Sequence, residues 1–406
     1  MPPDTFLDTF EAPSAFPQSV LDAAAHPDPY PYYAALLAYR PIYREHRLGL
    51  WVALGARAVS DVLGSELCRV RPPAEPVPAA ISGAAAGDIF KNLVRMSDGP
   101  RHATAKTAVG AYLGAFEPSR LASIARQEAA RLACELVGPH PRGFDRFSFA
   151  LPVQVIARLI GLSTDDAIKC ALLIGDFVRC LSPLSSPHDI ARSNKAAVAL
   201  QATLHNELRR NGHGGVAASA DRLHSLGIED SNAVLANLIG FMSQAHEATA
   251  GLIGNSLRAL GRDPGLCGRA AGDDALLQRV IGEVARHDPP VHNTRRLVAQ
   301  DGIVGGQAMK AGDQILVVLA AANRDPALHV HPHAFDPDRA DRSSSPSAPA
   351  ATPALGKRSP SASQRRAFRR CWRKASTSRR WLDRCHIAGR SIRAFRCSAA
   401  RNEERG

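Results

Sequence analysis

The sequence predicts one large, mainly α-helical domain with a small β portion, followed by a poorly ordered basic tail. The chain has 406 residues, of which 45% are hydrophobic and 22% charged, so it can bury a large core. Helical periodicity dominates the body, whereas strand-like patterns occupy only short runs. After Asp341 the periodicity ends and Ser and Arg become dominant. We therefore expect a domain at 1–340 and a tail at 341–406.

The helices expected in the body follow one another with short breaks. Helical periodicity is strongest in four stretches, 103–137 (two runs around a Glu-Pro break), 144–161, 163–182 and 231–262. Ser163 or Thr164 is a suitable N-cap for the third stretch, because two acids follow. The fourth stretch is apolar almost all round, which predicts a helix through the middle of the protein.

The strands expected are few and short. The runs YRPIYRE and LGLWVAL near the start are rich in β-branched and aromatic residues. A later segment, DGIVGGQAMKAGDQILVVLAAAN at 301–323, contains GG and AGD, which are turn sequences typical of short hairpins. We expect these runs to form the β portion.

The net charge of +12 comes entirely from the tail. Residues 341–406 hold 17 Lys and Arg against 4 Asp and Glu, whereas the remaining residues hold 33 against 34. Nucleic acid or another polyanion is therefore expected to bind only through the tail, and without specificity. Eight scattered cysteines, the absence of a signal-peptide pattern and the absence of a membrane-length apolar run predict a soluble cytoplasmic protein with no membrane association.

Two segments place charges in unusual surroundings. In QAHEAT, Glu247 lies among apolar residues of the central helix, and such a carboxylate must be paired, hydrated or used in chemistry. The same segment lacks the second His of a zinc-protease motif, because residue 250 is Ala. In EVAR, Glu283 and Arg286 share one helix face, which is compatible with an ordinary surface pair.

Two further segments are informative only when they are considered together with QAHEAT and EVAR. MSDGPRHATAK places His102 and Lys106 on one face of a helix. NRDPALHVHPHAFDPDR ends at Arg339 and contains three alternating His in a loop, which is weak evidence for a metal site. In this order and spacing, the four segments resemble the cytochrome P450 family, of the soluble bacterial type, over roughly residues 20–340.

The resemblance implies a heme (iron protoporphyrin) cofactor and assigns roles around it. His102, Lys106 and Arg296 correspond to residues that neutralise the heme propionates. Lys106 departs from the family's usual Arg.

The resemblance also assigns roles to Glu247, to Glu283 and to residues associated with each of them. Glu247 and Thr249 correspond to catalytic positions of the distal helix, although Ala248 stands where the family usually has an alcohol. Glu283, Arg286 and Arg339 correspond to a structural set behind the heme. None of this set is expected to be catalytic.

One required segment of the family is missing. About a dozen residues after FDPDR the family has a loop of the form FGxGxHxCxG, whose Cys ligates the iron; this sequence has SAPAATPALG instead. Read one base earlier, the codons for these ten residues can spell FGAGRHACPG. We therefore predict a frameshift near residues 341–346 and no metal ligand in the present reading frame. Cys371 and Cys385 lack the flanking glycines that the loop needs.

The resemblance implies a heme-dependent monooxygenase that inserts one atom of O2 into a small apolar substrate. Electrons would come from a separate ferredoxin or flavoprotein. The missing loop predicts that this chain is impaired or inactive. Two alternatives remain open: a non-catalytic remnant that binds small ligands or heme, and polyanion binding by the basic tail.

Overall fold

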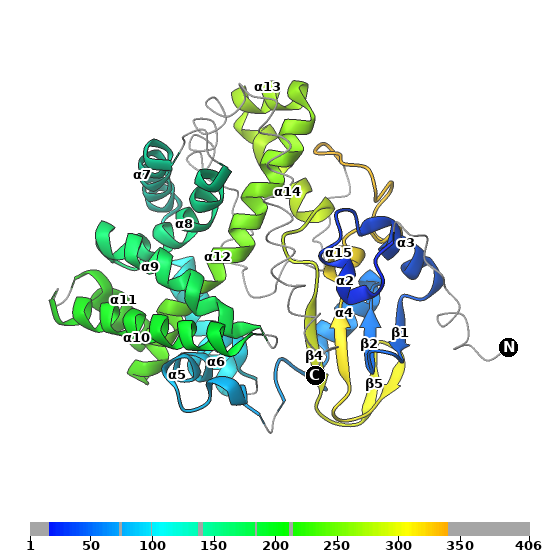
Figure 1. The fold of residues 1–406 in the computed structure, drawn as a ribbon, viewed down its shortest axis with the longest axis horizontal. Helices are drawn as coiled ribbons and strands as arrows, with labels where there is room; N and C mark the ends of the chain where they lie inside the picture. Colours follow the sequence, from blue (N-terminus) through cyan, green and yellow to red (C-terminus); the bar gives the residue numbers. More distant parts are fainter. Residues whose placement is uncertain are drawn as a thin grey trace.

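The computed structural model describes residues 16–72, 75–98, 100–136, 141–182, 185–210 and 214–339. The tail expected at 341–406 lies outside these residues. Within them, helices occupy one side of the molecule and a small sheet the other (Figure 1). The mainly α fold with a small β portion is confirmed.

The helices follow a regular order along the chain. The N-terminal part contains α2 (Val20–Ala23), α3 (Tyr30–Tyr39), α4 (Ala56–Gly64), α5 (Ala85–Asn92), α6 (Pro100–Gly114), and the 3-10 turns η1 (Ala79–Ile81) and η2 (Val94–Met96). The middle contains α7 (Pro118–Leu136), α8 (Pro141–Leu159), α9 (Thr164–Phe177), η3 (Val178–Leu181), α10 (Pro187–Arg210) and α11 (Gly215–Ser225). The last helices are α12 (Ser231–Arg262), α13 (Pro264–Gly272), α14 (Asp274–His287) and α15 (Leu319–Ala322).

The predicted helices are confirmed at these positions. The Glu-Pro break separates α6 from α7, and the Ser163 hydroxyl caps α9 by accepting a hydrogen bond from the Asp166 amide at 3.1 Å. The central helix α12 spans the predicted residues and is N-capped by Asp230, whose carboxylate accepts from the Asn232 amide at 2.8 Å.

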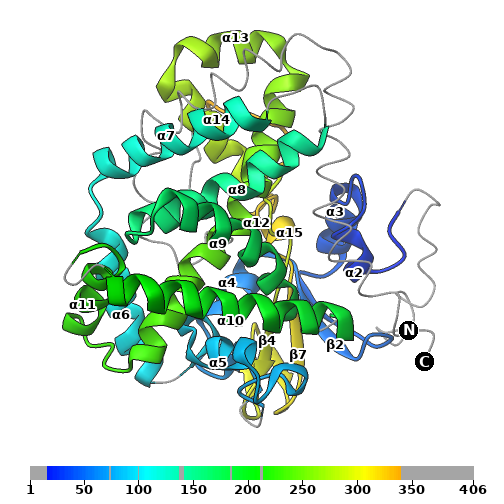
Figure 2. The ribbon, with the colours of Figure 1, turned by 60° about the vertical axis from the view of Figure 1, so that its left-hand side comes forward.

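Helix α12 forms the axis of the helical part. It packs against α8, α9 and α5, and its first half is buried almost continuously from Val234 to Ser243. Figures 1 and 2 show it running between the other helices and the sheet. A side chain at any position on α12 therefore faces one of several different neighbouring elements.

The main sheet has five strands in the order β1-β2-β7-β4-β3. Their bounds are β1 (Ile42–Glu45), β2 (Leu50–Ala53), β3 (Cys68–Arg69), β4 (Thr294–Val298) and β7 (Gln314–Val317). Strands β2 and β7 are parallel and the other pairs antiparallel. Asp313 fixes the start of β7, because its carboxylate accepts from Trp51 Nε1 at 3.0 Å and from Arg44 Nη1 at 2.8 Å.

The hairpin segment at 301–323 is confirmed in part. It contains β5 (Gly302–Val304), β6 (Gln307–Met309) and β7, but residues 319–322 form the short helix α15 instead of continuing the strand. The turn between β5 and β6 consists of Gly305 and Gly306, both at positive φ, which glycine adopts without strain. None of the described helices combines the length and apolarity needed to cross a membrane.

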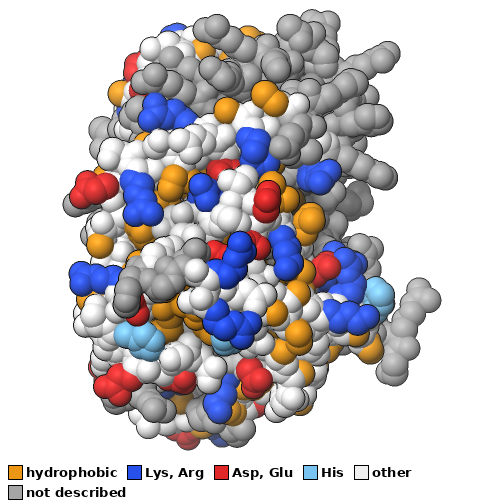
Figure 3. All heavy atoms as spheres, turned by 90° about the vertical axis from the view of Figure 1, so that its left-hand side faces the viewer, with side chains coloured by type: hydrophobic (Ala, Val, Ile, Leu, Met, Phe, Trp, Pro, Cys, Tyr) orange, Lys and Arg blue, Asp and Glu red, His pale blue; other side chains and the backbone are white. Residues whose placement is uncertain are grey.

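Charges are intermixed on the face formed by the helical side. Figure 3 shows Lys and Arg beside Asp and Glu, with apolar side chains between them. Leu172 of α9 and Val198 of α10 are the strongly exposed apolar side chains of these two helices. The described part of this face therefore carries no single-sign patch that would attract a polyanion.

Candidate functional site

The end of α14 holds a buried ionic cluster. Glu283 and Arg286 form a bidentate pair, with Arg286 Nε donating to Oε2 at 3.0 Å and Nη2 to Oε1 at 2.7 Å. Both side chains are almost fully buried, at 3% and 6% exposure. The i, i+3 spacing of Glu283 and Arg286 is also found in surface ion pairs, but here both side chains lie in the interior.

The chain after α15 completes this cluster. Arg339 Nε approaches Glu283 Oε2 at 3.2 Å, and the Asp336 amide donates to Glu283 Oε1 at 3.0 Å. Arg286 also donates to the carbonyl oxygens of Asn323 and Pro332 at 3.1 and 2.8 Å and of Ala334 at 2.9 Å. The structure thus brings together Glu283, Arg286 and Arg339, the three residues expected to form a structural set.

A second group of polar residues, not predicted from the sequence, lies next to this cluster. The Arg324 guanidinium lies 3.3 Å from the ring centroid of Tyr30 and donates to the carbonyl oxygen of His287. His287 Nε2 donates to the carbonyl of His333 at 3.0 Å, while its Nδ1 accepts from Arg324 Nη2 at 3.0 Å. Burial first, and then the charge of Arg324, lower the pKa of His287 to about 3.

Glu247 is half-buried in the second half of α12. Its neighbour His246 is buried and its ring lies 4.8 Å, centroid to centroid, from that of Phe149. Ala248 is half-buried and Thr249 is exposed. Since two residues turn a helix by about 200°, Thr249 and Glu247 lie on different faces of α12.

His102 is anchored to η2 by one ring nitrogen. Its Nδ1 lies 2.8 Å from the carbonyl oxygen of Val94. Because a carbonyl oxygen only accepts, Nδ1 must carry a hydrogen. The other nitrogen, Nε2, would then donate to a carboxylate only when the ring is doubly protonated.

The two other residues expected at the propionates differ in exposure. Lys106 is exposed on α6, one turn beyond His102. Arg296, on β4, is half-buried, and its Nη1 donates to the carbonyl of Arg295 at 2.8 Å. Burial lowers the pKa of Arg296, and the nearby thiol of Cys68 and carboxylate of Asp98 raise it. Arg296 therefore lies near the segment that leads into α6.

Arg95, in η2, is a residue that sequence reasoning missed. Its Nε is shielded from solvent and has no hydrogen-bond partner among the described residues. Burial lowers its pKa, while the charge of Glu247 raises it. No sequence pattern distinguishes this Arg from the exposed basic residues around it, because its position depends on how η2 packs on α12.

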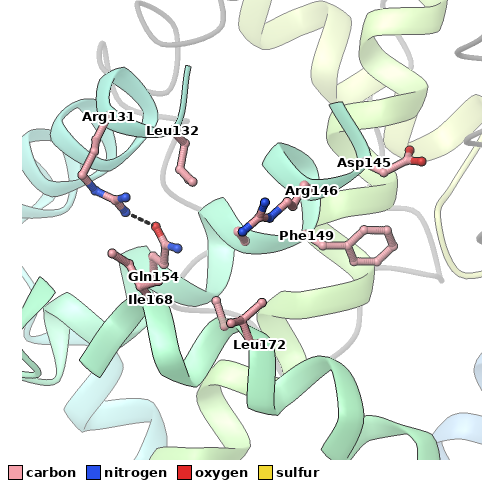
Figure 4. Close-up of a pocket in the computed structure, with 10 residues that line it drawn as sticks. Arg131, Leu132, Asp145, Arg146, Phe149, Gln154, Ile168 and Leu172 are labelled. Carbon is pink, nitrogen blue, oxygen red and sulfur yellow. Dashed lines mark hydrogen bonds between the residues drawn. The ribbon is translucent and has the colours of Figure 1, made fainter. Parts of the chain in front are cut away.

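A cavity of about 320 Å³ lies elsewhere, between α7, α8 and α9 (Figure 4). Its lining includes Arg131, Asp145, Arg146, Phe149 and Gln154, and a hydrogen bond joins Arg131 to Gln154. Burial raises the pKa of the Asp145 carboxyl. None of the residues predicted for the functional site lines this cavity.

The residues predicted for the two sides of a heme have chemistry suited to those roles. His102, Lys106 and Arg296 supply basic groups suited to carboxylates, and α12 supplies the acid Glu247. The buried thiols do not suit an axial thiolate, because burial raises the pKa of Cys170 to about 12 and that of Cys180 to about 11. The position expected for the proximal loop lies outside the described residues.

Comparison with known proteins agrees with this architecture. The sequence profile "Cytochrome P450" matches residues 191–351. Cytochrome P450 133B2 of Xylella fastidiosa is 30% identical over 191 residues, which is 46% of this chain and 48% of that protein. Cytochrome P450 140 of Mycobacterium bovis is 25% identical over 343 residues, 79% of this chain and 76% of that protein. The chain spans about half the length of the first curated relatives it matches.

The fold has close structural counterparts. The crystal structure of P450BioI, in complex with an acyl carrier protein ligated to hexadec-9Z-enoic acid, has a TM-score of 0.71 at 20% identity. The match covers 86% of this chain and 92% of P450BioI. The profile match, the relatives and this shared fold show that the chain is similar to the cytochrome P450 family.

Proposed function

We propose that this protein is built as a heme-dependent monooxygenase, and that the chain in its present reading frame is impaired. Similarity to the family implies a heme-iron cofactor. The single observation that supports the catalytic part is Glu247, a half-buried carboxylate on the helix that faces the distal side in this fold. When bound, the heme would supply the activation of O2 and the insertion of one oxygen atom into a small apolar substrate.

The residues of this chain would contribute binding and proton transfer. His102, Lys106 and Arg296 would bind the propionates through charge-assisted hydrogen bonds. Glu247 would take a proton from water at its carboxylate oxygen and release it on the distal side. Since Ala248 has no hydroxyl and Thr249 lies on another face, a water molecule or a substrate hydroxyl would have to continue the path.

The remaining roles are structural or external. We infer that Glu283, Arg286 and Arg339 hold the end of α14 to the segment that would lead into the proximal loop. Electrons would come from a separate ferredoxin or flavoprotein, the class of donor that the resemblance to the family implies.

The proposed impairment rests on the reading frame. The chain has no Cys between Cys267 and Cys371, and the family profile match stops at residue 351. A frameshift near residues 341–346 would explain the missing Cys, as well as the Arg-rich composition that follows.

The test is to sequence genomic DNA across codons 335–365 and to express both the present chain and the frame-restored chain. We expect the restored chain to give a thiolate-type spectrum when reduced and treated with carbon monoxide, and the present chain to give none. A full thiolate-type spectrum from the present chain would refute the impairment, and the absence of any Cys loop in all frames would refute the frameshift.

A second candidate function follows from the charge of the tail. The 17 Lys and Arg of residues 341–406 would bind phosphate polymers without specificity. Deleting 341–406 should abolish binding to heparin or DNA at low salt. Retained binding would assign it to the body and exclude the tail.

A further inference from the structure

The cavity between α7, α8 and α9 combines an apolar wall with a few polar groups. Its volume of about 320 Å³ lies at the lower end of the range of roughly 300–1,000 Å³ that is usual for small-molecule sites. The large apolar side chains of its lining are Leu132, Phe149, Ile168 and Leu172. A pocket of this size and composition is suited to a compact ligand that is mainly apolar.

Gln154 is the buried polar residue of this lining, with only 2% of its surface exposed. Its Oε1 accepts a hydrogen bond from Arg131 Nη2, and because a guanidinium only donates, the amide oxygen must face Arg131. The amide nitrogen, Nε2, makes no hydrogen bond with any residue that the structure describes. In Figure 4 it lies on the side of Leu172, away from Arg131. A ligand in the cavity could therefore accept the hydrogen bond that Nε2 has to offer.

The guanidinium group of Arg131 shares its carboxylate partner with another Arg. Arg131 Nη2 lies 2.7 Å from Oε2 of the buried Glu128. The other oxygen of Glu128, Oε1, lies 3.5 Å from Arg158 Nε. One carboxylate is thus placed between two guanidinium groups, which leaves positive charge in excess beside the cavity.

Arg146 adds a further positive charge to the lining. It is exposed on α8, and it forms no hydrogen bond or ion pair with a described residue. Figure 4 shows its guanidinium on the side of the cavity opposite Arg131, whereas the carboxylate of Asp145 is directed away from both guanidinium groups. The polar part of the lining therefore presents donors and positive charge, which suit an anionic acceptor.

We propose that this cavity binds a small aromatic monocarboxylate, with its carboxylate held by Gln154 Nε2 and Arg146 and its ring against the apolar wall. A guanidinium binds a carboxylate through two parallel hydrogen bonds, and a carboxylate has lone pairs left for the amide donor. The ring would pack against Phe149, since pairs of aromatic rings add to the stabilisation from burial. The site is separate from the residues assigned to the heme, so this inference goes beyond the proposed function.

The test compares 1-naphthoate with naphthalen-1-ylmethanol, two ligands that have the same ring and of which only the first is charged. Isothermal titration calorimetry of the full chain measures the dissociation constant of each ligand, for the unaltered protein and for Arg146→Met, Gln154→Glu and Arg57→Met. Gln154→Glu keeps an oxygen that accepts from Arg131, but it removes the Nε2 donor and adds a negative charge. Arg57→Met is the matched control, because the Arg57 side chain is 96% exposed and lies on α4.

We expect the unaltered protein to bind 1-naphthoate more tightly than the alcohol. Arg146→Met should weaken 1-naphthoate by about tenfold, as for the loss of a hydrogen bond between charged groups, and Gln154→Glu by more than about tenfold. Both variants should change the affinity for the alcohol by less than about threefold, because the apolar wall is unaltered. Arg57→Met should change neither affinity.

Three outcomes would overturn the proposal. Absence of 1-naphthoate binding to the unaltered protein would mean that the cavity holds only water. Unchanged binding in both Arg146→Met and Gln154→Glu would place the ligand elsewhere, and equal affinity for the acid and the alcohol would show that the cavity does not select an anion. If Gln154→Glu does not fold, as judged by circular dichroism, Arg146→Met at its exposed position decides the question alone.

Discussion

The charges around Glu283 are almost fully buried and hydrogen-bonded, whereas Arg95 is half-buried and only its Nε is shielded from solvent. Glu283 and Arg286 share two hydrogen bonds, and Arg339 and three backbone carbonyls use the remaining donors and acceptors. Arg95 has no such bond to a described residue; burial lowers its pKa and the charge of Glu247 raises it.

This difference separates a bonded structural cluster from a side chain that the protein does not bond. A completely bonded buried cluster stabilises one arrangement of the backbone. A half-buried charge without bonds to the protein adds nothing to that arrangement, and its partial burial is a cost. Substitutions in the two regions should therefore have opposite signs for stability.

The largest effect is expected for Glu283→Gln. Removing the carboxylate charge leaves Arg286 and Arg339 buried without a counter-ion, which costs about 3–5 kcal/mol in comparable cases. Whole domains have only about 5–15 kcal/mol, so this loss is a large fraction of the total stability. Urea denaturation followed by circular dichroism measures the loss, with Glu66→Gln, at an exposed acid, as the control. A change below about 1 kcal/mol would show that the cluster is not structural.

A pH-dependent loss of stability is expected from His287, beside this cluster. Its pKa is lowered from 6.5 to about 3, so between these values the unfolded chain binds a proton that the folded chain does not. Stability is therefore complete above about pH 6.5 and falls as the pH decreases towards 3. Between pH 7 and about pH 4.5 the loss should be roughly 3 kcal/mol.

The structural reason is the fixed tautomer of His287. Nδ1 accepts a hydrogen bond from Arg324, so a proton on Nδ1 would face a guanidinium. His287→Gln keeps a donor and an acceptor but does not titrate, and should show a shallower pH dependence in the same denaturation experiment. Equal slopes for the two proteins would exclude His287 as the source.

An effect of opposite sign is expected for Arg95→Met. Because the guanidinium has no hydrogen bond to a described residue, replacing it with an apolar side chain of similar length should leave stability unchanged or raise it by up to about 1–2 kcal/mol. The matched substitution Arg286→Met should cost about 3–5 kcal/mol. Melting temperatures of the two variants, measured without ligand, decide the comparison. A clear destabilisation by Arg95→Met would mean that Arg95 has a structural role.

The sequence was sufficient to predict the hydrogen-bonded cluster around Glu283 but not the position of Arg95. Helix α12 was predicted at its observed bounds because residues 231–262 form a long apolar run with helical periodicity, and Glu283, Arg286 and Arg339 were predicted through their resemblance to a known pattern. Strand β4 was not predicted, since TRRLV carries two Arg and becomes a strand through its pairing with β7.

Arg95 and the contact between Tyr30 and Arg324 were not predicted for a related reason. Arg95 lies in the polar segment RMSDGPR, and its burial results from the contact of Asn92–Val94 with α12, about 145 residues later in the chain. The ring of Tyr30 meets a guanidinium nearly 300 residues further on. Periodicity and local motifs describe neighbours in the sequence, and neither feature depends on such neighbours.

The smallest effect is expected at the exposed pair of Arg57 and Asp61, which calibrates the comparison. Arg57 Nε and Asp61 Oδ2 are 3.9 Å apart on α4, and the side chains are 96% and 48% exposed. Water screens this pair, so Arg57→Ala and Asp61→Ala should each change the free energy of unfolding by less than about 0.5 kcal/mol, and the double variant should show little coupling. A larger effect would mean that charge alone, without burial, influences stability in this fold. In that case the opposite signs expected at Glu283 and Arg95 could not be attributed to the presence or absence of hydrogen bonds.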